Sequence, residues 1–309
     1  MITLLGLPSR ANAQALGWEG ETGVFVTPLA YTANVEGQKF HAAAAYHYLN
    51  AGTVIGDFHE VSLEVGAFKR FEFGYTREYH VYGGTPGLSY LWQDGFDIFN
   101  AKATVIPENF KKLAWMPQIS VGTIVRTDDR NVGDYLYSLP KSSGGVYTNG
   151  KLNNGKHNQD IYVVGSKMIT KVGERKTPIP ILLSAGVRGT NSELWGMGGN
   201  APDWGAYAFG SAAFVVKLPE KMTVVFASEA AQQPHHPLGY TSTSDVGGAK
   251  LNIPTTLTYA ARFIPSPKSH MNFDVGVAQI DGRASGTEAA PGVNLKARHQ
   301  VGVQMSYNF

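Results

Sequence analysis

The chain of 309 residues has no cysteine, few charged residues and no apolar run long enough to form a membrane-crossing helix. Without cysteine there is no disulfide framework, no thiolate metal site and no cysteine nucleophile. Charged residues make up only 16% of the chain, and the formal net charge is +2 with no basic run. The charge therefore gives no support to nucleic-acid binding.

What the chain has in quantity is glycine and aromatic residues: 36 Gly, 15 Tyr and 15 Phe. This composition is typical of an all-β protein rather than a helical or α/β one. The strands of a transmembrane β-barrel alternate apolar and polar residues, so such a chain crosses a bilayer while its mean hydropathy stays near zero. The mean hydropathy here is -0.15.

Residues 295–309 alternate between the two faces of a strand without interruption and end on an aromatic carboxyl terminus. A half-buried strand of a soluble sandwich alternates in the same way, but soluble strands run to about 5–6 residues and bilayer-crossing strands to about 9–11. Met305, Tyr307 and Phe309 fall on the apolar face. This ending resembles the terminal assembly signal of Gram-negative outer-membrane β-barrels.

Segments of period two along the rest of the chain predict about twelve strands, an even number as bacterial barrels require. They cover residues 40–48, 60–68, 70–79, 97–106, 115–126, 159–170, 179–190, 206–217, 222–231, 255–264, 271–280 and 296–309. The predicted fold is all-β, a transmembrane antiparallel up-and-down β-barrel.

The predicted connections alternate between two kinds, as expected for short periplasmic turns and long extracellular loops. The short ones are rich in Pro, Lys and Glu and lie at residues 69, 107–114, 171–178, 218–221 and 265–270. The long ones are rich in Gly, Asn, Ser and Trp and lie at 49–59, 80–96, 127–158, 191–205, 232–254 and 281–295.

The N-terminal part predicts two further units. Residues 1–15 carry a short apolar run followed by small-x-small sites at Ala11, Ala13 and Ala15, which indicates the remnant of a signal peptide; a disordered amphipathic tail is the alternative. Residues 23–33 would make a thirteenth strand and place the amino terminus outside the cell. We therefore expect residues 16–38 to plug or cap the barrel, which occupies 39–309.

Strand parity predicts a polar lumen with charges of both signs, acidic on the early strands and basic on those that follow. The predicted lumen-lining residues are His41, His47, Glu64, Glu72, Glu78, Lys102, Arg126, Lys167, Arg188, Glu229, Arg262, Asp274, Lys296 and Arg298. An open pore predicts that these charges are exposed to water. A closed barrel predicts that Glu72 or Arg188 is held in a salt bridge.

Motifs for chemistry fail on their context, so we predict no catalytic residue, no metal and no cofactor. Residues 145–151 match the start of a phosphate loop, but Leu152 replaces the hydroxyl residue and no helix pattern follows. His235 and His236 stand between two prolines without a nearby carboxylate. Ser228 and His299, the candidates for a lipid-facing hydrolase, fall on strands that are not neighbours.

Three stretches carry a family resemblance. They are Trp-Met-Pro-Gln-Ile-Ser-Val-Gly at 115–122, the pair 162–164 with 182–186, and the ending Gln-Val-Gly-Val-Gln-Met-Ser-Tyr-Asn-Phe at 300–309. They resemble an uncharacterised family of proteobacterial outer-membrane barrel proteins, carried as a domain of unknown function, whose glycine-rich opening is similar to residues 19–28. The resemblance implies the outer membrane and a barrel, and it supplies no catalytic residues.

The sequence thus predicts a narrow outer-membrane channel for small polar or charged solutes. The alternative is a closed structural or complex-forming barrel that binds a protein partner through its loops or N-terminal segment. Uptake of apolar compounds fits a charged lumen poorly. The expected partners are outer-membrane lipid, the outer-membrane assembly machinery, and either small polar solutes or a protein, with no nucleic acid.

Overall fold

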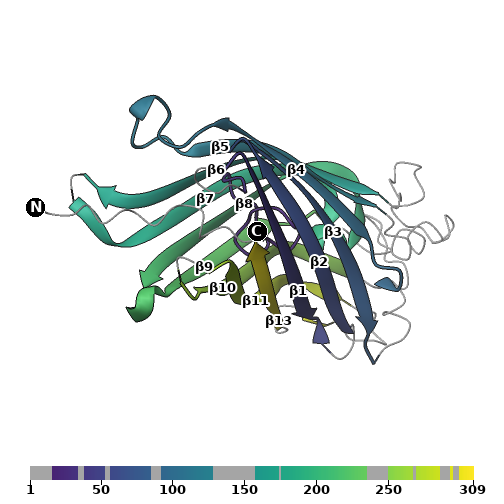
Figure 1. Ribbon diagram of the computed structural model, residues 1–309. Helices are drawn as coiled ribbons and strands as arrows, with labels where there is room; N and C mark the ends of the chain where they lie inside the picture. Colours follow the sequence, from purple (N-terminus) through teal and green to yellow (C-terminus); the bar gives the residue numbers. More distant parts are fainter. Residues whose placement is uncertain are drawn as a thin grey trace, which may run out of the picture.

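Twelve antiparallel strands close into a barrel in the computed structural model (Figure 1). The structure describes residues 16–33, 38–52, 56–84, 92–127, 157–173, 175–234, 250–266, 269–285, 293–294 and 299–309. The strands are β1 (Phe40–Asn50), β2 (Gly56–Ala67), β3 (Phe71–Tyr82), β4 (Asp97–Ile106), β5 (Gln118–Thr127), β6 (Asn158–Val172), β7 (Arg175–Glu193), β8 (Gly199–Lys217), β9 (Thr223–Gln232), β10 (Lys250–Ile264), β11 (Met271–Ser285) and β13 (His299–Asn308). A two-residue strand, β12 (Val293–Asn294), pairs with the end of β11.

Each strand pairs with its neighbour in the chain, and the last strand closes the ring. β13 pairs with β11 on one side and with β1 on the other, in register from Ala43 opposite Asn308 to Asn50 opposite Val301. Closure leaves no open edge in the described sheet, so every strand finds hydrogen-bond partners on both sides. The up-and-down barrel predicted from the alternation is confirmed.

The strands are longer than the sequence predicts at the end of the barrel that carries the long loops. β1 and β2 are separated only by residues 51–55, and β7 and β8 only by residues 194–198, so the long loops expected at 49–59 and 191–205 are wrong. The reason is that backbone pairing continues beyond the last apolar side chain, where glycine and polar residues gave a loop signal. The loops at 128–156 and 235–249 lie outside the described residues.

The opposite end carries short connections with single 3-10 turns. η3 (Phe110–Lys112) lies between β4 and β5, and η7 (Pro219–Lys221) lies between β8 and β9. A third turn, η6 (Leu194–Gly196), follows β7 at the other end. No helix in the described part of the chain is long and apolar enough to cross a membrane.

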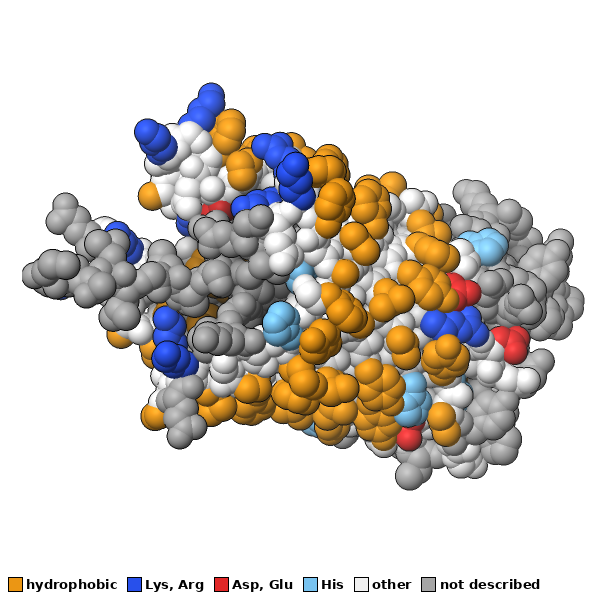
Figure 2. Space-filling model, viewed as in Figure 1, with side chains coloured by type: hydrophobic (Ala, Val, Ile, Leu, Met, Phe, Trp, Pro, Cys, Tyr) orange, Lys and Arg blue, Asp and Glu red, His pale blue; other side chains and the backbone are white. Residues whose placement is uncertain are grey.

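The outer surface of the barrel is an apolar band (Figure 2). Side chains that alternate along the strands are exposed there, among them Leu63, Phe73, Phe99, Val163, Phe226, Tyr259 and Val303. Lys and Arg side chains gather beyond this band, at the end with the short turns (Figure 2). A closed barrel with an apolar exterior and a polar interior is the arrangement of an outer-membrane β-barrel, which confirms the predicted fold and location.

The apolar band gives a direct test of membrane depth. Val163 is 50% exposed near the middle of β6, so we expect Val163→Arg to destabilise the barrel by roughly 2–4 kcal/mol. Val172→Arg, at the end of the same strand, should cost no more than about 1 kcal/mol because the new charge reaches water. Urea unfolding in lipid vesicles measures both, and equal costs would contradict the assigned depth.

Candidate functional site

Residues 16–33 lie inside the barrel and form a compact double loop, which we call the luminal segment. Two isolated β-bridges, Leu16 with Thr22 and Gly23 with Pro28, hold its shape. The main-chain N–H of Trp18 donates to the Phe25 carbonyl at 2.8 Å. The segment is too short to bury a core of its own, so its position depends on its bonds to the barrel wall.

Carboxylates on β2 and β3 accept hydrogen bonds from main-chain N–H groups of the luminal segment. The Thr22 N–H donates to Glu64 at 3.0 Å and to Glu72 at 2.9 Å, and the Ala33 N–H donates to the other oxygen of Glu72 at 2.7 Å. Glu64 and Glu72 are 2% and 0% exposed. Buried main-chain donors need partners, and these carboxylates supply them.

Glu229 on β9 does the same from the other side of the barrel. Its carboxylate accepts the N–H groups of Phe25, Val26 and Thr27 at 3.1, 3.1 and 2.8 Å, and the Thr27 hydroxyl at 2.6 Å. Three consecutive main-chain donors aimed at one carboxylate form an anion-binding nest. The luminal segment is therefore held by its backbone rather than by its side chains alone.

Donors on the wall complete the arrangement by bonding the carbonyls of the luminal segment. Lys102 donates to the Thr22 carbonyl at 3.0 Å, and Arg262 donates to the Val24 carbonyl at 2.5 Å. Gln118 donates to the Ala30 carbonyl at 2.8 Å. Further donors are Asn100 to Glu19, Ser120 to Ala30 and Gln304 to Leu16, each to the main-chain carbonyl.

The charged residues of the wall form ion pairs between neighbouring strands. Lys102 pairs with Glu72 at 2.8 Å, and Arg262 pairs with Asp274 at 2.9 Å. The predicted acidic and basic walls therefore meet at the seam between β3 and β4 and do not face each other across an open lumen. Because these side chains are buried, each charge depends on its partner.

A third group of charges lies nearer the long-loop end. Arg126 pairs with Asp160 at 3.0 Å and with Glu19 of the luminal segment, and Arg188 lies 3.5 Å from Asp160. Arg126 also donates to Asn158 at 3.0 Å. The guanidinium groups of Arg126 and Arg188 thus share the carboxylate of Asp160, and Arg126 has a second carboxylate partner in Glu19 of the luminal segment.

Three glycines of the wall make room for the luminal segment. A Cβ at Gly66 would stand 1.7 Å from the Ala33 carbonyl oxygen, and a Cβ at Gly276 or Gly302 would stand 3.0 or 2.8 Å from the Phe25 ring. All three lie on the inward face of their strands. The segment therefore approaches the wall closely, with its backbone at Gly66 and with the Phe25 ring at Gly276 and Gly302.

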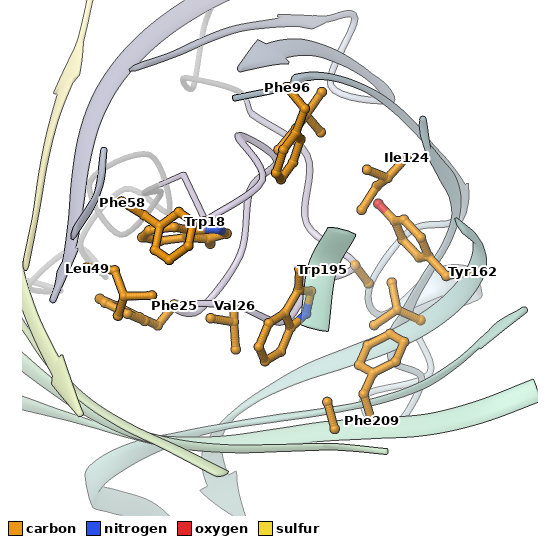
Figure 3. Close-up of a cluster of buried hydrophobic side chains, with 14 residues drawn as sticks. Trp18, Phe25, Val26, Leu49, Phe58, Phe96, Ile124, Tyr162, Trp195 and Phe209 are labelled. Carbon is orange, nitrogen blue, oxygen red and sulfur yellow. The ribbon is translucent and has the colours of Figure 1, made fainter. Parts of the chain in front are cut away.

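An apolar cluster, which we call the apolar layer, joins the luminal segment to the strands inside the barrel (Figure 3). It joins Trp18, Phe25, Val26 and Ala30 of the luminal segment to inward side chains of the strands and of η6, namely Leu49, Phe58, Phe96, Ile98, Ile124, Tyr162, Val164, Trp195, Phe209 and Ala231. The two best-defined cavities of the described part measure about 10 and 40 Å³. Such spaces hold a water molecule or two, and the inward side chains around the luminal segment are buried.

The structure buries most of the predicted lumen-lining residues on the inward face. These are His41, His47, Glu64, Glu72, Glu78, Lys102, Arg126, Arg188, Glu229, Arg262 and Asp274. Lys167 differs, because it has the parity of exposed Ile161 and Val163 and its ammonium group bonds Glu108 at 3.2 Å near a short turn. Its assignment to the lumen is wrong. Lys296 and Arg298 lie outside the described residues.

Two inward carboxylates were missed by the sequence analysis, Glu60 on β2 and Asp160 on β6. Placing Lys167 in the lumen implies the opposite parity for β6 from the one observed, and Asp160 was not named among the lumen-lining residues. Glu60 has the same parity on β2 as Glu64, and this parity could have identified it as an inward residue. Both are at most 1% exposed.

No chemical site appears in the described part of the chain. No group of three or more His, Asp or Glu side chains there is arranged to hold a metal ion. Ser228 on β9 and His299 on β13 are separated by β10 and β11, which lie between their strands. His235, His236 and residues 145–151 lie outside the described residues. The arrangement binds and encloses a peptide segment, and the groups that do so belong to the polar wall of the barrel.

Comparisons with known proteins assign no function to this chain. No family model and no curated protein matches the chain, so the resemblance to an uncharacterised family stays a prediction. Similar solved structures include the KdgM porin (TM-score 0.44, 9% identity, covering 86% of this chain and 99% of that chain) and the NanC porin (0.40, 9%, 86% and 98%). The CymD monoaromatic hydrocarbon channel is another (0.33, 12%, 88% and 88%). These scores are too low to transfer a solute or an activity.

The buried group around Arg126 gives a stability test. Arg126→Met leaves Asp160 and Glu19 without their closest cation, so we expect a loss of about 3–5 kcal/mol in the free energy of unfolding. The matched control is Arg77→Met, which breaks a partly exposed pair with Asp97 at 3.4 Å and should cost less than about 1 kcal/mol. Urea unfolding in vesicles measures both variants, and a small loss for Arg126→Met would show that water or another cation compensates.

Proposed function

We propose that this protein is an outer-membrane channel for small polar solutes, held shut by residues 16–33 of its own chain. In this proposal the luminal segment is a plug, and solutes pass when it moves out of the polar region of the wall. The proposal that the barrel is a channel rests on the polar side chains of its wall. The proposal that it is closed rests on the luminal segment, which lies inside the barrel in this structure.

One observation carries the proposal: besides its ion pairs between strands, the polar wall is bonded to the main chain of a separate segment. A barrel that is closed permanently can fill its lumen with side chains from its strands, as barrels of about eight strands do. Here Gly66, Gly276 and Gly302 place no side chain in the lumen, and the luminal segment occupies the space. Its departure would expose to water the carboxylates, amides and hydroxyls that now bond it, beside the inward apolar side chains of the strands.

The wall charges support a closed state for the structure described here. Glu72 is buried and paired with Lys102 at 2.8 Å, and Arg188 lies 3.5 Å from Asp160. An open pore in this state would leave these groups exposed to water. The proposal therefore requires a second state, reached by breaking hydrogen bonds that water can replace.

A closed structural barrel that binds a protein partner is the second candidate. The contacts of the lumen favour it, because the inward carboxylates Glu64, Glu72 and Glu229 are buried against the luminal segment. The two candidates differ in what happens when the luminal segment is displaced: a channel then conducts ions, whereas a structural barrel loses stability without conducting.

Displacement is achieved by filling the glycine positions in the full-length protein. In Gly66→Leu/Gly302→Leu the new side chains meet the Ala33 carbonyl and the Phe25 ring. Overpacking costs roughly 1–3 kcal/mol at each site, so we expect the open fraction in planar bilayers to rise roughly tenfold or more. Single-channel recording measures it.

The control for this variant is Gly165→Leu. Gly165 faces outward, and the nearest atoms to an added Cβ are 3.9 Å away. It should conduct as the unaltered protein does. Unchanged silence of the double variant, with the barrel shown to be folded by circular dichroism and heat-modifiable migration, would contradict the channel and favour the structural barrel.

The absence of cysteine permits a reversible lock on the luminal segment. The Ala30 N–H donates to the Ser166 hydroxyl at 2.8 Å, which places the two residues within the span of a disulfide. We expect Ala30→Cys/Ser166→Cys, built into the double leucine variant, to be silent when oxidised and to conduct after reduction. Each single cysteine variant is the control, and conductance that ignores reduction would contradict the assignment of residues 16–33 as the plug.

A further inference from the structure

We infer that the open channel selects cations over anions, and that Glu64 and Glu229 carry this selectivity. The inference rests on the proposed function, because it describes the wall that the luminal segment leaves behind. The class of solute it implies is small and cationic: alkali ions, ammonium and guanidinium compounds.

The buried charges of the described wall are unequal in number. Seven carboxylates face inward from the strands, against four Lys and Arg side chains. The carboxylates are Glu60, Glu64, Glu72, Glu78, Asp160, Glu229 and Asp274, and the cations are Lys102, Arg126, Arg188 and Arg262. With the luminal segment absent, this part of the wall is negative.

Two groups at the level of the luminal segment repeat the same imbalance. On one side Glu64 and Glu72 stand with Lys102, which pairs with Glu72 at 2.8 Å. On the other side Glu229 and Asp274 stand with Arg262, which pairs with Asp274 at 2.9 Å. Each group therefore has one carboxylate more than its cation neutralises.

The luminal segment compensates both groups through its backbone. Its N–H groups go to the surplus carboxylates, Thr22 to Glu64 and residues 25–27 to Glu229. Its carbonyls go to the cations, Thr22 to Lys102 and Val24 to Arg262. When the segment leaves, the carboxylates lose donors that only water or a passing cation can replace.

The two surplus carboxylates also lie at a similar position along the luminal segment. They accept from the main-chain nitrogens of Thr22 and Phe25, which are three residues apart, so the two carboxylates lie within roughly 16 Å of each other. Two carboxylates beside one passage concentrate the field there, because low-dielectric walls focus it on the passing ion. Carboxylate pairs facing a pore are a common cation filter.

The long-loop end of the lumen has the same sign. Arg126 and Arg188 lie there with three wall carboxylates, Asp160, Glu60 and Glu78. Glu60 on β2 stands directly opposite Glu78 on β3. Glu60 is fully buried and aimed into the lumen, and neither of its oxygens has a hydrogen-bond partner in the described part of the chain. A cation entering from this end meets a carboxylate with no other partner.

The experiment is the reversal potential of the full-length Gly66→Leu/Gly302→Leu protein in a planar bilayer with a tenfold gradient of KCl. K⁺ and Cl⁻ have nearly equal mobility in water, so a non-selective pore gives a reversal potential near zero. We expect a cation-directed potential that corresponds to roughly tenfold preference for K⁺ at 0.1 M salt. The preference should weaken at 1 M, where the Debye length falls to about 3 Å.

Two further variants in the same background assign the effect to its residues. Glu64→Gln/Glu229→Gln should bring the preference close to one, with conductance retained. Asp57→Asn/Asp97→Asn removes two carboxylates from outward positions and should leave the preference unchanged. A zero or anion-directed potential in the conducting parent would overturn the inference alone, whereas a folded parent that never conducts would overturn it together with the proposed channel. An unchanged preference in the glutamine pair would overturn the roles of Glu64 and Glu229.

Discussion

The structure depends on hydrogen bonds between buried carboxylates and main-chain N–H groups. Glu64, Glu72 and Glu229 would each be costly to bury alone inside a barrel, and the N–H groups of residues 22–33 would be equally costly without acceptors. Together they satisfy one another. Because the donors belong to the backbone, the interaction depends on the path of the luminal segment more than on its side chains, and the wall is shaped to receive that path.

The wall glycines and the apolar layer act on the same segment in different ways. Gly66, Gly276 and Gly302 allow close approach, whereas Trp18 and Phe25 bury apolar surface against strand side chains. Burial of apolar surface holds the segment without direction, and the carboxylates fix its register. A polar wall alone would bind water as readily as it binds a peptide, so burial of the Trp18 and Phe25 rings is what favours the occupied lumen.

The sequence predicted the barrel well because strand alternation is a physical requirement of lipid outside and polar groups inside. The twelve strands, their order and most inward charges follow from parity alone, as Glu72 and Arg262 illustrate. Parity failed on β6, where Lys167 near the turn was taken for a luminal residue and Asp160 was lost. A long lysine side chain beside a short turn reaches water from the outer face, so its charge alone does not show which face of the strand it occupies.

The interior contacts were beyond the sequence for a different reason. Phe58, Tyr162 and Phe209 point inward although they are apolar, because the luminal segment gives them something to pack against. No period within one strand reports that neighbour. The sequence analysis predicted β7 and β8 too short for a related reason, because backbone pairing continues beyond the last alternating apolar residues. Trp195, in the connection between these strands, points into the lumen.

The closing pair of strands has a consequence for the order of assembly. β1 is the first strand after the luminal segment, and it pairs with β13, which is far from it in the chain. Gln304 on β13 donates to the Leu16 carbonyl, and Gly302 beside it receives the Phe25 ring. The seam that completes the cylinder is thus also a surface of the bound segment. Enclosing a peptide that is already in place requires only that the two ends of the sheet meet around it, whereas a cylinder closed first would have to admit the same peptide through its narrow rim.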